Sequence, residues 1–279
     1  MAESSERGWH SERTAHAYEK YAQGHSMYKA TAHDLVAIAG TTPGMTVVDV
    51  ACGTGIVTEA ILERLGETGS VTGVDRSSEM LAVAGRKIQA ANVTFVQSLA
   101  ERLNEVIKVT ADVAVCNSAF WQIRMSEALT ALGIILKAGG RFVFNLPHSF
   151  FRFTAEDAPV SSSPSLDQLI LEIATREYGF TLPDLSRRRR PLDFASVESI
   201  IEKSGFTLAS YETITYQKPI EETLSFLRIP IMLESRLPGL PEIAQIAILE
   251  NAWAQYDKPN SPFADTWTYF VTKKRMHTV

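Results

Sequence analysis

The sequence predicts a doubly wound α/β fold, in which a mostly parallel sheet carries helices on both faces. Between residues 45 and 146, short β-branched apolar runs alternate with segments of helical periodicity. Two glycines follow directly after the first apolar run, and an acidic residue ends the second. Strands joined by helices of this length form right-handed crossover units, and such units build a parallel sheet.

The individual elements follow from local signals. A helix over 30–39 is stopped by Gly40 and Pro43. Ser77 is a candidate N-cap for the helix that follows the second strand. The pair Gly139-Gly140 should supply the turn before the fifth strand. Strands are predicted at 45–51, 71–75, 93–97, 111–117 and 141–146, and helices at 56–65, 77–91 and 126–136.

The alternation stops after Leu146, and helices then interrupt the remaining strands. Helices are predicted at 166–175, 221–227 and 242–256, and Asp193 is the candidate N-cap of a helix that ends at Gly205. Strands are predicted at 206–216 and 266–272. We therefore divide the chain into an N-terminal segment of loop and short helix (1–30), an α/β core (31–146), a cap insertion (147–192), and the rest of the sheet (193–279) with a second helical insertion at about 218–262.

Composition excludes several classes of protein. The chain has 279 residues, 45% of them hydrophobic, and a formal net charge of −5, which argues against nucleic-acid binding through bulk positive charge. No apolar stretch approaches the roughly 18 residues of a membrane span, and the polar start shows no secretory signal. Cys52 and Cys116 lie in apolar runs and have no zinc-like spacing. We therefore expect a reduced, cytoplasmic protein without a metal site.

The strongest functional signal is the segment from Asp49 to Gly55, at the junction of the first strand and helix. Its two glycines, Gly53 and Gly55, let the backbone approach a ligand at the carboxyl ends of the strands, where open α/β sheets bind. Asp75, at the end of the second strand, is placed to accept hydrogen bonds from ribose hydroxyls. The combination predicts a nucleoside cofactor, because a turn that only needs glycine would not explain Asp75.

The charge at the glycine turn favours one cofactor over another. A dinucleotide site usually has a third glycine where this chain has Thr58, and the carboxylate of Asp49 would repel a pyrophosphate. The same carboxylate would attract a sulfonium or ammonium group. S-adenosylmethionine therefore fits better, and a nicotinamide-dependent oxidoreductase remains the alternative on the same topology.

Five segments carry a family resemblance, in chain order: VVDVACGTG, VTGVDRSSEML, FVQSLAERL, ADVAVCNSAF and LKAGGRFVF. They resemble the successive motifs of class I S-adenosylmethionine-dependent methyltransferases, in the version of the small-molecule and quinone-methylating branch. The resemblance covers roughly residues 15–146 and implies a sheet of about seven strands. It also implies methyl transfer to a small-molecule acceptor, with O-methylation favoured and C- or N-methylation as alternatives.

The resemblance also assigns cofactor-binding residues. It implies that Asp49, Ala51, Gly53 and Gly55 line the methionine end, that Asp75 holds the ribose, and that Arg76 and Met80 flank ribose and adenine. It places Leu99 and Ala100 beside the adenine, Asn117 and Ser118 near the methionine moiety, and Tyr18 and Tyr21 over the cofactor. Two residues depart from the family pattern. Ala51 stands where the first motif glycine would be, and Leu99 stands where an acidic residue would bind the adenine amine.

The sequence contains weaker signals for the site that binds the methyl acceptor. His148 follows the fifth strand and is a candidate general base, or else a surface histidine. Five aromatic residues could form an apolar acceptor pocket or ordinary core: Phe120, Trp121, Phe150, Phe151 and Phe153. The run Arg187–Arg190 is either a solvated loop or a docking patch for an anion. A non-catalytic cofactor-binding regulator remains open, and the oligomeric state is not predicted.

Overall fold

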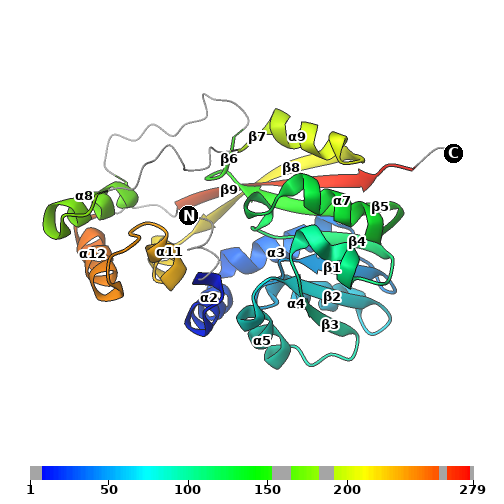
Figure 1. Cartoon of the computed structure of the whole chain (residues 1–279), viewed down its shortest axis with the longest axis horizontal. Coiled ribbons are helices and arrows are strands. Elements are labelled where there is room, and N and C mark those ends of the chain that lie inside the picture. The colour runs from blue at the N-terminus through cyan, green and yellow to red at the C-terminus, as the bar shows by residue number, and fades with distance from the viewer. Residues whose placement is uncertain (1–7, 153–164, 182–191, 258–262, 277–279) are drawn as a thin grey trace.

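A seven-stranded sheet forms the centre of the molecule, in the order β3-β2-β1-β4-β5-β9-β8 (Figure 1). The computed structural model describes residues 8–152, 165–181, 192–257 and 263–276, so that Phe153 and Arg187–Arg190 lie outside it. The five strands from β3 to β5 are parallel, whereas β9 runs antiparallel to both β5 and β8. This arrangement confirms the predicted doubly wound, mostly parallel fold.

The strands of this sheet are β1 (Thr46–Val50), β2 (Ser70–Asp75), β3 (Val93–Gln97), β4 (Ala111–Cys116), β5 (Leu136–Pro147), β8 (Phe206–Lys218) and β9 (Phe263–Lys274). A separate two-stranded ladder consists of β6 (Phe151–Arg152) and β7 (Leu192–Asp193). The helices are α2 (Glu12–Gly24), α3 (Ser26–Ile38), α4 (Ile56–Leu65), α5 (Ser78–Lys87), α6 (Leu103–Val106), α7 (Met125–Ile135), α8 (Leu166–Tyr178), α9 (Phe194–Lys203), α10 (Ile220–Leu227), α11 (Pro230–Glu234) and α12 (Glu242–Gln255). Among them, none combines the length and apolar composition needed to cross a lipid bilayer.

Both predicted helix caps are confirmed. The Ser77 hydroxyl accepts a hydrogen bond from the backbone N–H of Met80 at 3.1 Å, at the start of α5. The Asp193 carboxylate accepts one from the backbone N–H of Ser196 at 2.8 Å, at the start of α9. Helix α5 ends at Lys87 and not at residue 91 as predicted.

Two local predictions are wrong. Gly139-Gly140 does not form a turn before a strand but lies within β5, where the pairing shifts from Ala111–Leu136 to Val113–Arg141. Gly139 has a φ of +72°, which allows this bulge. Residues 12–29, predicted as loop and short helix, lie almost entirely in the 13-residue helices α2 and α3, whereas the helix predicted at 30–39 is the second half of α3. Their stability comes from a face that is buried against the rest of the molecule, which local sequence reveals only weakly.

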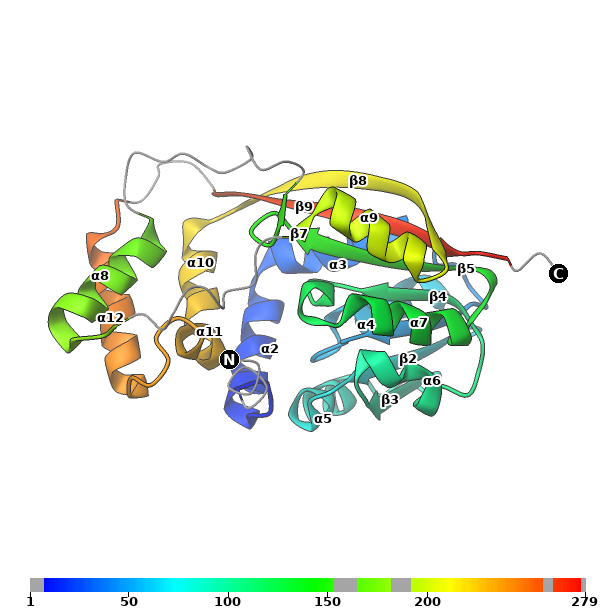
Figure 2. The same cartoon turned by 45° about the horizontal axis from the view of Figure 1, so that its top comes forward.

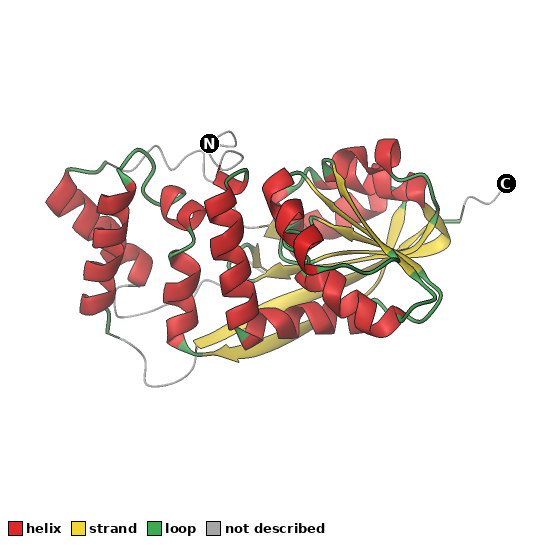
Figure 3. Cartoon of the chain, turned by 90° about the horizontal axis from the view of Figure 1, so that it is seen from below, coloured by secondary structure: helices red, strands yellow, loops and turns green. Residues whose placement is uncertain are grey.

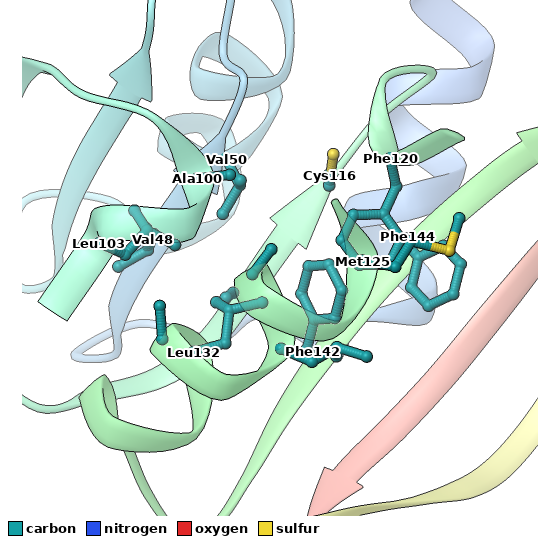
Figure 4. Packing of buried hydrophobic residues seen from close by; sticks show 14 of the residues in the cluster. Val48, Val50, Ala100, Leu103, Cys116, Phe120, Met125, Leu132, Phe142 and Phe144 are labelled. Carbon is teal, nitrogen blue, oxygen red and sulfur yellow. The ribbon is translucent and has the colours of Figure 1, made fainter. Parts of the chain in front are cut away.

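The core consists of two apolar layers, one on each face of the sheet. Val48 and Val50 contribute to the first layer, which α7 and α9 cover, while Val47 contributes to the second, which α3 and α4 cover. Figure 4 shows Phe120, Phe142 and Phe144 packed together in the first layer. Cys52 and Cys116 are buried free thiols, as the sequence predicts.

A group of helices outside the sheet forms a cap with its own apolar cluster, which includes Ile170 from α8, Leu227 from α10 and Ile248 from α12. The cap therefore joins helices from both predicted insertions. Figures 2 and 3 show these helices at one end of the molecule, with α2 between them and the sheet. The arrowhead of β5 points toward this end, so the cap lies on the side of the carboxyl ends of the strands (Figure 2).

Candidate cofactor and acceptor site

The loop between β1 and α4 takes a left-handed backbone at three positions. Ala51, Gly53 and Gly55 have φ values of +56°, +55° and +88°. For a residue with a Cβ atom this conformation costs roughly 1–2 kcal/mol, so Ala51 is strained where the family pattern has glycine. A Cβ atom on Gly55 would lie 2.7 Å from Ile88 Cδ1, so a side chain at this position would also require Ile88 to move.

Asp75 fastens this loop to the end of β2. Its Oδ2 accepts a hydrogen bond from the backbone N–H of Gly53, and its Oδ1 accepts one from the backbone N–H of Ser77, both at 2.9 Å. Burial raises the pKa of Asp75, and these two N–H groups oppose the rise. Each carboxylate oxygen keeps a second lone pair, so Asp75 can hold the loop and still accept a hydrogen bond from a ligand.

Asp49 is a buried carboxylate with one unsatisfied oxygen. Its side chain is 1% exposed, and Oδ2 accepts a hydrogen bond from the Thr58 hydroxyl at 2.7 Å. Oδ1 is buried and has no hydrogen-bond partner within the described residues. Burial raises the pKa of Asp49 to about 7, Thr58 lowers it, and the nearby charge of Asp75 raises it further. Thr58 thus supports the acid that distinguishes this loop from a dinucleotide site.

Two tyrosines from the N-terminal helices lie near the loop. A Cβ atom built on Gly53 would lie 3.6 Å from Tyr18, and the hydroxyls of Tyr18 and Tyr28 are hydrogen-bonded. Burial raises the pKa of Tyr28, and the nearby charge of Asp49 contributes to the rise. Tyr21 lies one ring further out, with its centroid 5.8 Å from that of Tyr28 and 5.3 Å from that of Phe226 on α10.

Sequence reasoning did not select Tyr28 as a site residue. A usable signal was present, because Tyr28 begins an i, i+3, i+4, i+7, i+8 series with Thr31, Ala32, Leu35 and Val36, all of which are buried. The series marks the face of α3 that packs against the sheet, and Tyr28 stands at its first position.

Contacts at the start of the described chain hold α2 beside this site. The Ser77 hydroxyl donates to the backbone carbonyl of Trp9 at 2.8 Å, and His10 Nδ1 lies 3.5 Å from a carboxylate oxygen of Glu79. Lys87 on α5 forms an ion pair with Glu19 on α2 at 3.0 Å. The N-terminal segment therefore reaches over the end of β2, next to Asp75.

A pocket of about 480 Å³ lies beyond the ends of β2 and β3, in the direction in which the adenine is expected. Arg76 and Leu99, both predicted cofactor residues, line it. Met80 and Ala100 do not, because their side chains pack into apolar clusters. The lining residues are His10, Arg76, Gln97, Ser98, Leu99, Arg102, Glu105 and Val106.

Asn117 and Ser118 follow β4, next to β5. Ser118 is the second non-glycine residue with a positive φ, +56°, within the described chain. Its backbone N–H donates to the side chain of Asn145 on β5 at 2.7 Å. Asn145 was not among the predicted site residues, because its contact depends on strand pairing.

On the predicted acceptor side, His148 Nε2 lies 2.9 Å from the Thr268 hydroxyl on β9. Trp121 and Phe150, which follow β4 and β5, stack with centroids 3.8 Å apart and planes at 8°. Phe150 is 40% exposed, whereas Phe120 and Phe151 are fully buried in the core. Of the four described aromatic residues, only the stacked pair is thus placed to meet a ligand.

Parts of this chain are similar in sequence to known proteins. Residues 47–140 match a family model described as a methyltransferase domain. The ubiquinone/menaquinone biosynthesis C-methyltransferase UbiE of Shewanella pealeana is 29% identical over 189 residues, covering 63% of this chain and 72% of the relative. The enzyme of the same name from Pseudomonas aeruginosa is 28% identical over 192 residues, covering 64% and 72%.

Solved structures share the fold at lower identity. The cyclopropane synthase MmaA2 from Mycobacterium tuberculosis aligns with a TM-score of 0.55 at 16% identity, covering 88% of this chain and 84% of that one. Phosphoethanolamine N-methyltransferase 2 from Haemonchus contortus, in complex with S-adenosyl-L-methionine, aligns with a TM-score of 0.51 at 19% identity, covering 87% and 52%.

The sheet order, the glycine loop with Asp49, the aspartate that ends β2, and the matched methyltransferase domain all agree. They favour methyl transfer over the nicotinamide-dependent alternative. Together, these findings support a class I S-adenosylmethionine-dependent methyltransferase.

Proposed function

We propose that the chain transfers a methyl group from S-adenosylmethionine to the oxygen of a small, partly apolar acceptor. The observation that supports S-adenosylmethionine as the cofactor is the buried Oδ1 of Asp49 beside the glycine loop. This oxygen has no hydrogen-bond partner among the residues that the structure describes. A buried carboxylate without a full set of partners is costly, and a cationic ligand would compensate it. The residues present therefore fit a cofactor with an ammonium and a sulfonium group.

The chain's residues would share the binding of this cofactor along the carboxyl ends of β1, β2 and β4. Asp75 would accept from the ribose, while the pocket with Arg76 and Leu99 would take the adenine. Gly53 and Ser118 would offer backbone groups at the methionine end. Tyr18, with Tyr21 behind it, would cover that end and exclude water. When bound, the cofactor supplies a methyl group that is already activated on a sulfonium.

The protein then has to align the acceptor and remove its proton. We propose that His148 is the base that accepts this proton. With Nε2–H donating to Thr268, the basic lone pair of the neutral imidazole is on Nδ1. The stacked rings of Trp121 and Phe150 would hold a planar apolar part of the acceptor.

The named relatives are C-methyltransferases, which keeps a ring carbon as the second candidate atom. Removing the proton of a phenolic hydroxyl raises the nucleophilicity of both its oxygen and the ring carbon beside it. A hydroxylated aromatic acceptor is therefore compatible with both outcomes, and the position of the new methyl group in the product distinguishes them. Oxygen is preferred here because removal of the hydroxyl proton leaves most of the negative charge on that atom.

The cofactor part is tested by titrating S-adenosylhomocysteine into the protein and into Asp75→Ala. Hydrogen bonds to a charged group contribute roughly 1.5–3 kcal/mol each, so the affinity should fall at least tenfold. Asp112→Ala is the matched control, because Asp112 also accepts from a backbone N–H, that of Thr46 at 2.9 Å, but at the opposite edge of the sheet. Equal affinity of Asp75→Ala and the unmodified protein would refute the assigned ribose position.

The acceptor part is tested by incubating the protein with methyl-labelled cofactor and a panel of hydroxylated aromatics, including alkylated quinols. Label in a product supports catalysis, and the product's NMR spectrum identifies the methylated atom. Tight cofactor binding without label in any panel member would favour the non-catalytic regulator.

A further inference from the structure

We propose that Asn145 on β5 is a positioning residue of the cofactor site, which holds the end of β4 in the conformation that the methionine end of the cofactor needs. This inference rests on the proposed cofactor site, in which Asn117 and Ser118 take part. Asn145 itself lies one strand away from that loop, and its side chain is fully buried.

The side chain of Asn145 makes two short hydrogen bonds to this loop. Its Oδ1 accepts from the backbone N–H of Ser118 at 2.7 Å, and its Nδ2 donates to Asn117 Oδ1 at 2.6 Å. A backbone N–H can only donate, so the atom facing Ser118 has to be the oxygen of the amide. The orientation of the Asn145 amide is thereby determined, and with it that of the Asn117 amide.

Ser118 needs this support because its φ of +56° is one that L-residues rarely adopt. A residue stays in such a conformation only where its surroundings impose it, and these positions cluster at binding sites. In this conformation, Oδ1 of Asn145 accepts the hydrogen bond of the Ser118 backbone N–H. Without it, the end of β4 can relax to a common conformation, and both Asn117 and Ser118 move.

The Asn117 amide is also linked to the helix that carries Tyr28. Asn117 Nδ2 lies 3.5 Å from the Thr31 hydroxyl, which donates to the Tyr28 carbonyl at 2.8 Å. Asn145 is thus connected through Asn117 and Thr31 to α3, the helix that carries Tyr28.

A buried asparagine could instead serve stability alone, and Thr272 on β9 provides the matched control. Thr272 is also fully buried in this sheet, and its hydroxyl donates to the Phe142 carbonyl at 2.8 Å, away from the loop. Asn145→Leu and Thr272→Val each remove buried hydrogen bonds. A purely structural role predicts that both variants lose stability and keep their affinity for the cofactor.

The experiment measures S-adenosylhomocysteine affinity by calorimetry and the free energy of unfolding by urea, for the unmodified protein and both variants. We expect Asn145→Leu to bind at least fivefold more weakly, and Thr272→Val to bind within twofold of the unmodified protein. Affinity of Asn145→Leu within twofold of the unmodified protein overturns the inference. No binding by the unmodified protein overturns the proposed cofactor site instead.

A second comparison tests the mechanism through Ser118. Glycine adopts positive φ without penalty, so Ser118→Gly should reduce the dependence on Asn145. The fold-loss caused by Asn145→Leu should be smaller in the Ser118→Gly background than in the native background. An equal fold-loss in both backgrounds contradicts the mechanism. Should Asn145→Leu fail to fold, Asn145→Ala, which removes the same two hydrogen bonds without added bulk, replaces it in both comparisons.

Discussion

At the scale of single residues, the site is built around carboxylates that are expensive to bury. Asp49 is almost completely buried and keeps one oxygen without a partner, while Asp75 uses both oxygens to hold backbone N–H groups. The two acids therefore have different roles. Asp75 organises the loop in the absence of any ligand, whereas Asp49 holds a potential charge that only a ligand can compensate.

The raised pKa of Asp49 predicts a pH-dependent stability. Its folded-state pKa of about 7 exceeds the ordinary value of 3.8, so the folded protein binds this proton more tightly than the unfolded chain. The contribution to the free energy of unfolding is complete below about pH 4 and is lost as the pH rises through about 7. Urea unfolding between these values should show the decline, and Asp49→Asn should remove it. Parallel pH profiles for the two proteins would contradict the assignment.

His148 should affect turnover and leave cofactor binding unchanged. If it removes a hydroxyl proton, His148→Ala should lower the turnover number by about 10²–10⁴-fold. The rate of the unmodified enzyme should also rise with pH, because only the neutral ring can accept the proton. His33→Ala is the control, since His33 is half-exposed and pairs with Glu63 at 3.6 Å on the surface. A fully active His148→Ala enzyme would exclude His148 as the base.

At the scale of elements, the glycine loop is shaped by helix packing as well as by its ligand. Gly55 is the N-cap of helix α4 and lies against Ile88 at the end of α5. The glycine at this position of the loop thus also reflects helix packing. The same holds in β5, where Gly140 could not carry a Cβ atom, since one would lie 2.9 Å from the Lys137 carbonyl.

Gly55→Ala should therefore destabilise the fold by two separable effects. The positive φ costs about 1–2 kcal/mol, and the new methyl group adds a clash with Ile88 that overpacking studies value at roughly 1–3 kcal/mol. Ile88→Ala removes the clash but not the strain. In a double-mutant cycle by urea unfolding, the cost of Gly55→Ala should be smaller in the Ile88→Ala background. Strict additivity would show that the two residues do not touch.

At the scale of the whole molecule, helices from distant parts of the sequence lie beside the edge of the sheet at which we propose the cofactor site. Helices α2 and α3 come from the start of the described chain, and the cap combines α8 with α10–α12. The two are in contact, since Tyr21 packs against Phe226 and Arg13 forms an ion pair with Glu242. Ligand binding at the sheet edge should consequently be coupled to the stability of the entire protein.

S-adenosylmethionine and S-adenosylhomocysteine should each raise the free energy of unfolding. At 100 times the dissociation constant, a ligand that binds only the folded state adds about 2.7 kcal/mol. Nicotinamide dinucleotides should not raise the free energy of unfolding. The Asp49 carboxylate would repel their pyrophosphate, and Thr58 stands where a dinucleotide site usually has its third glycine. Thermal unfolding at millimolar ligand measures this, and the absence of any shift with the first two compounds would refute the proposed cofactor.

The sequence alone was sufficient for the α/β alternation and for the glycine loop, because both depend on neighbouring residues. Helix α4 and strand β3 begin and end where the sequence predicts, and Ser77 and Asp193 cap their helices as expected. The order of the methyltransferase motifs likewise predicted the methyltransferase domain that the family model matches at residues 47–140. These features are encoded in periodicity, glycine positions and capping residues, which act over a few positions.

The tertiary structure decided which side chains meet across that edge. Asn145 lies 27 residues from Ser118, and their contact exists only because β5 pairs with β4. Tyr28 reaches the loop because α3 packs on the sheet, and α2 is a helix because its apolar residues are buried against neighbouring helices. Such contacts between distant residues depend on strand order and helix docking. Local patterns were therefore sufficient to predict the glycine loop, and only the fold showed which distant residues contact this edge of the sheet.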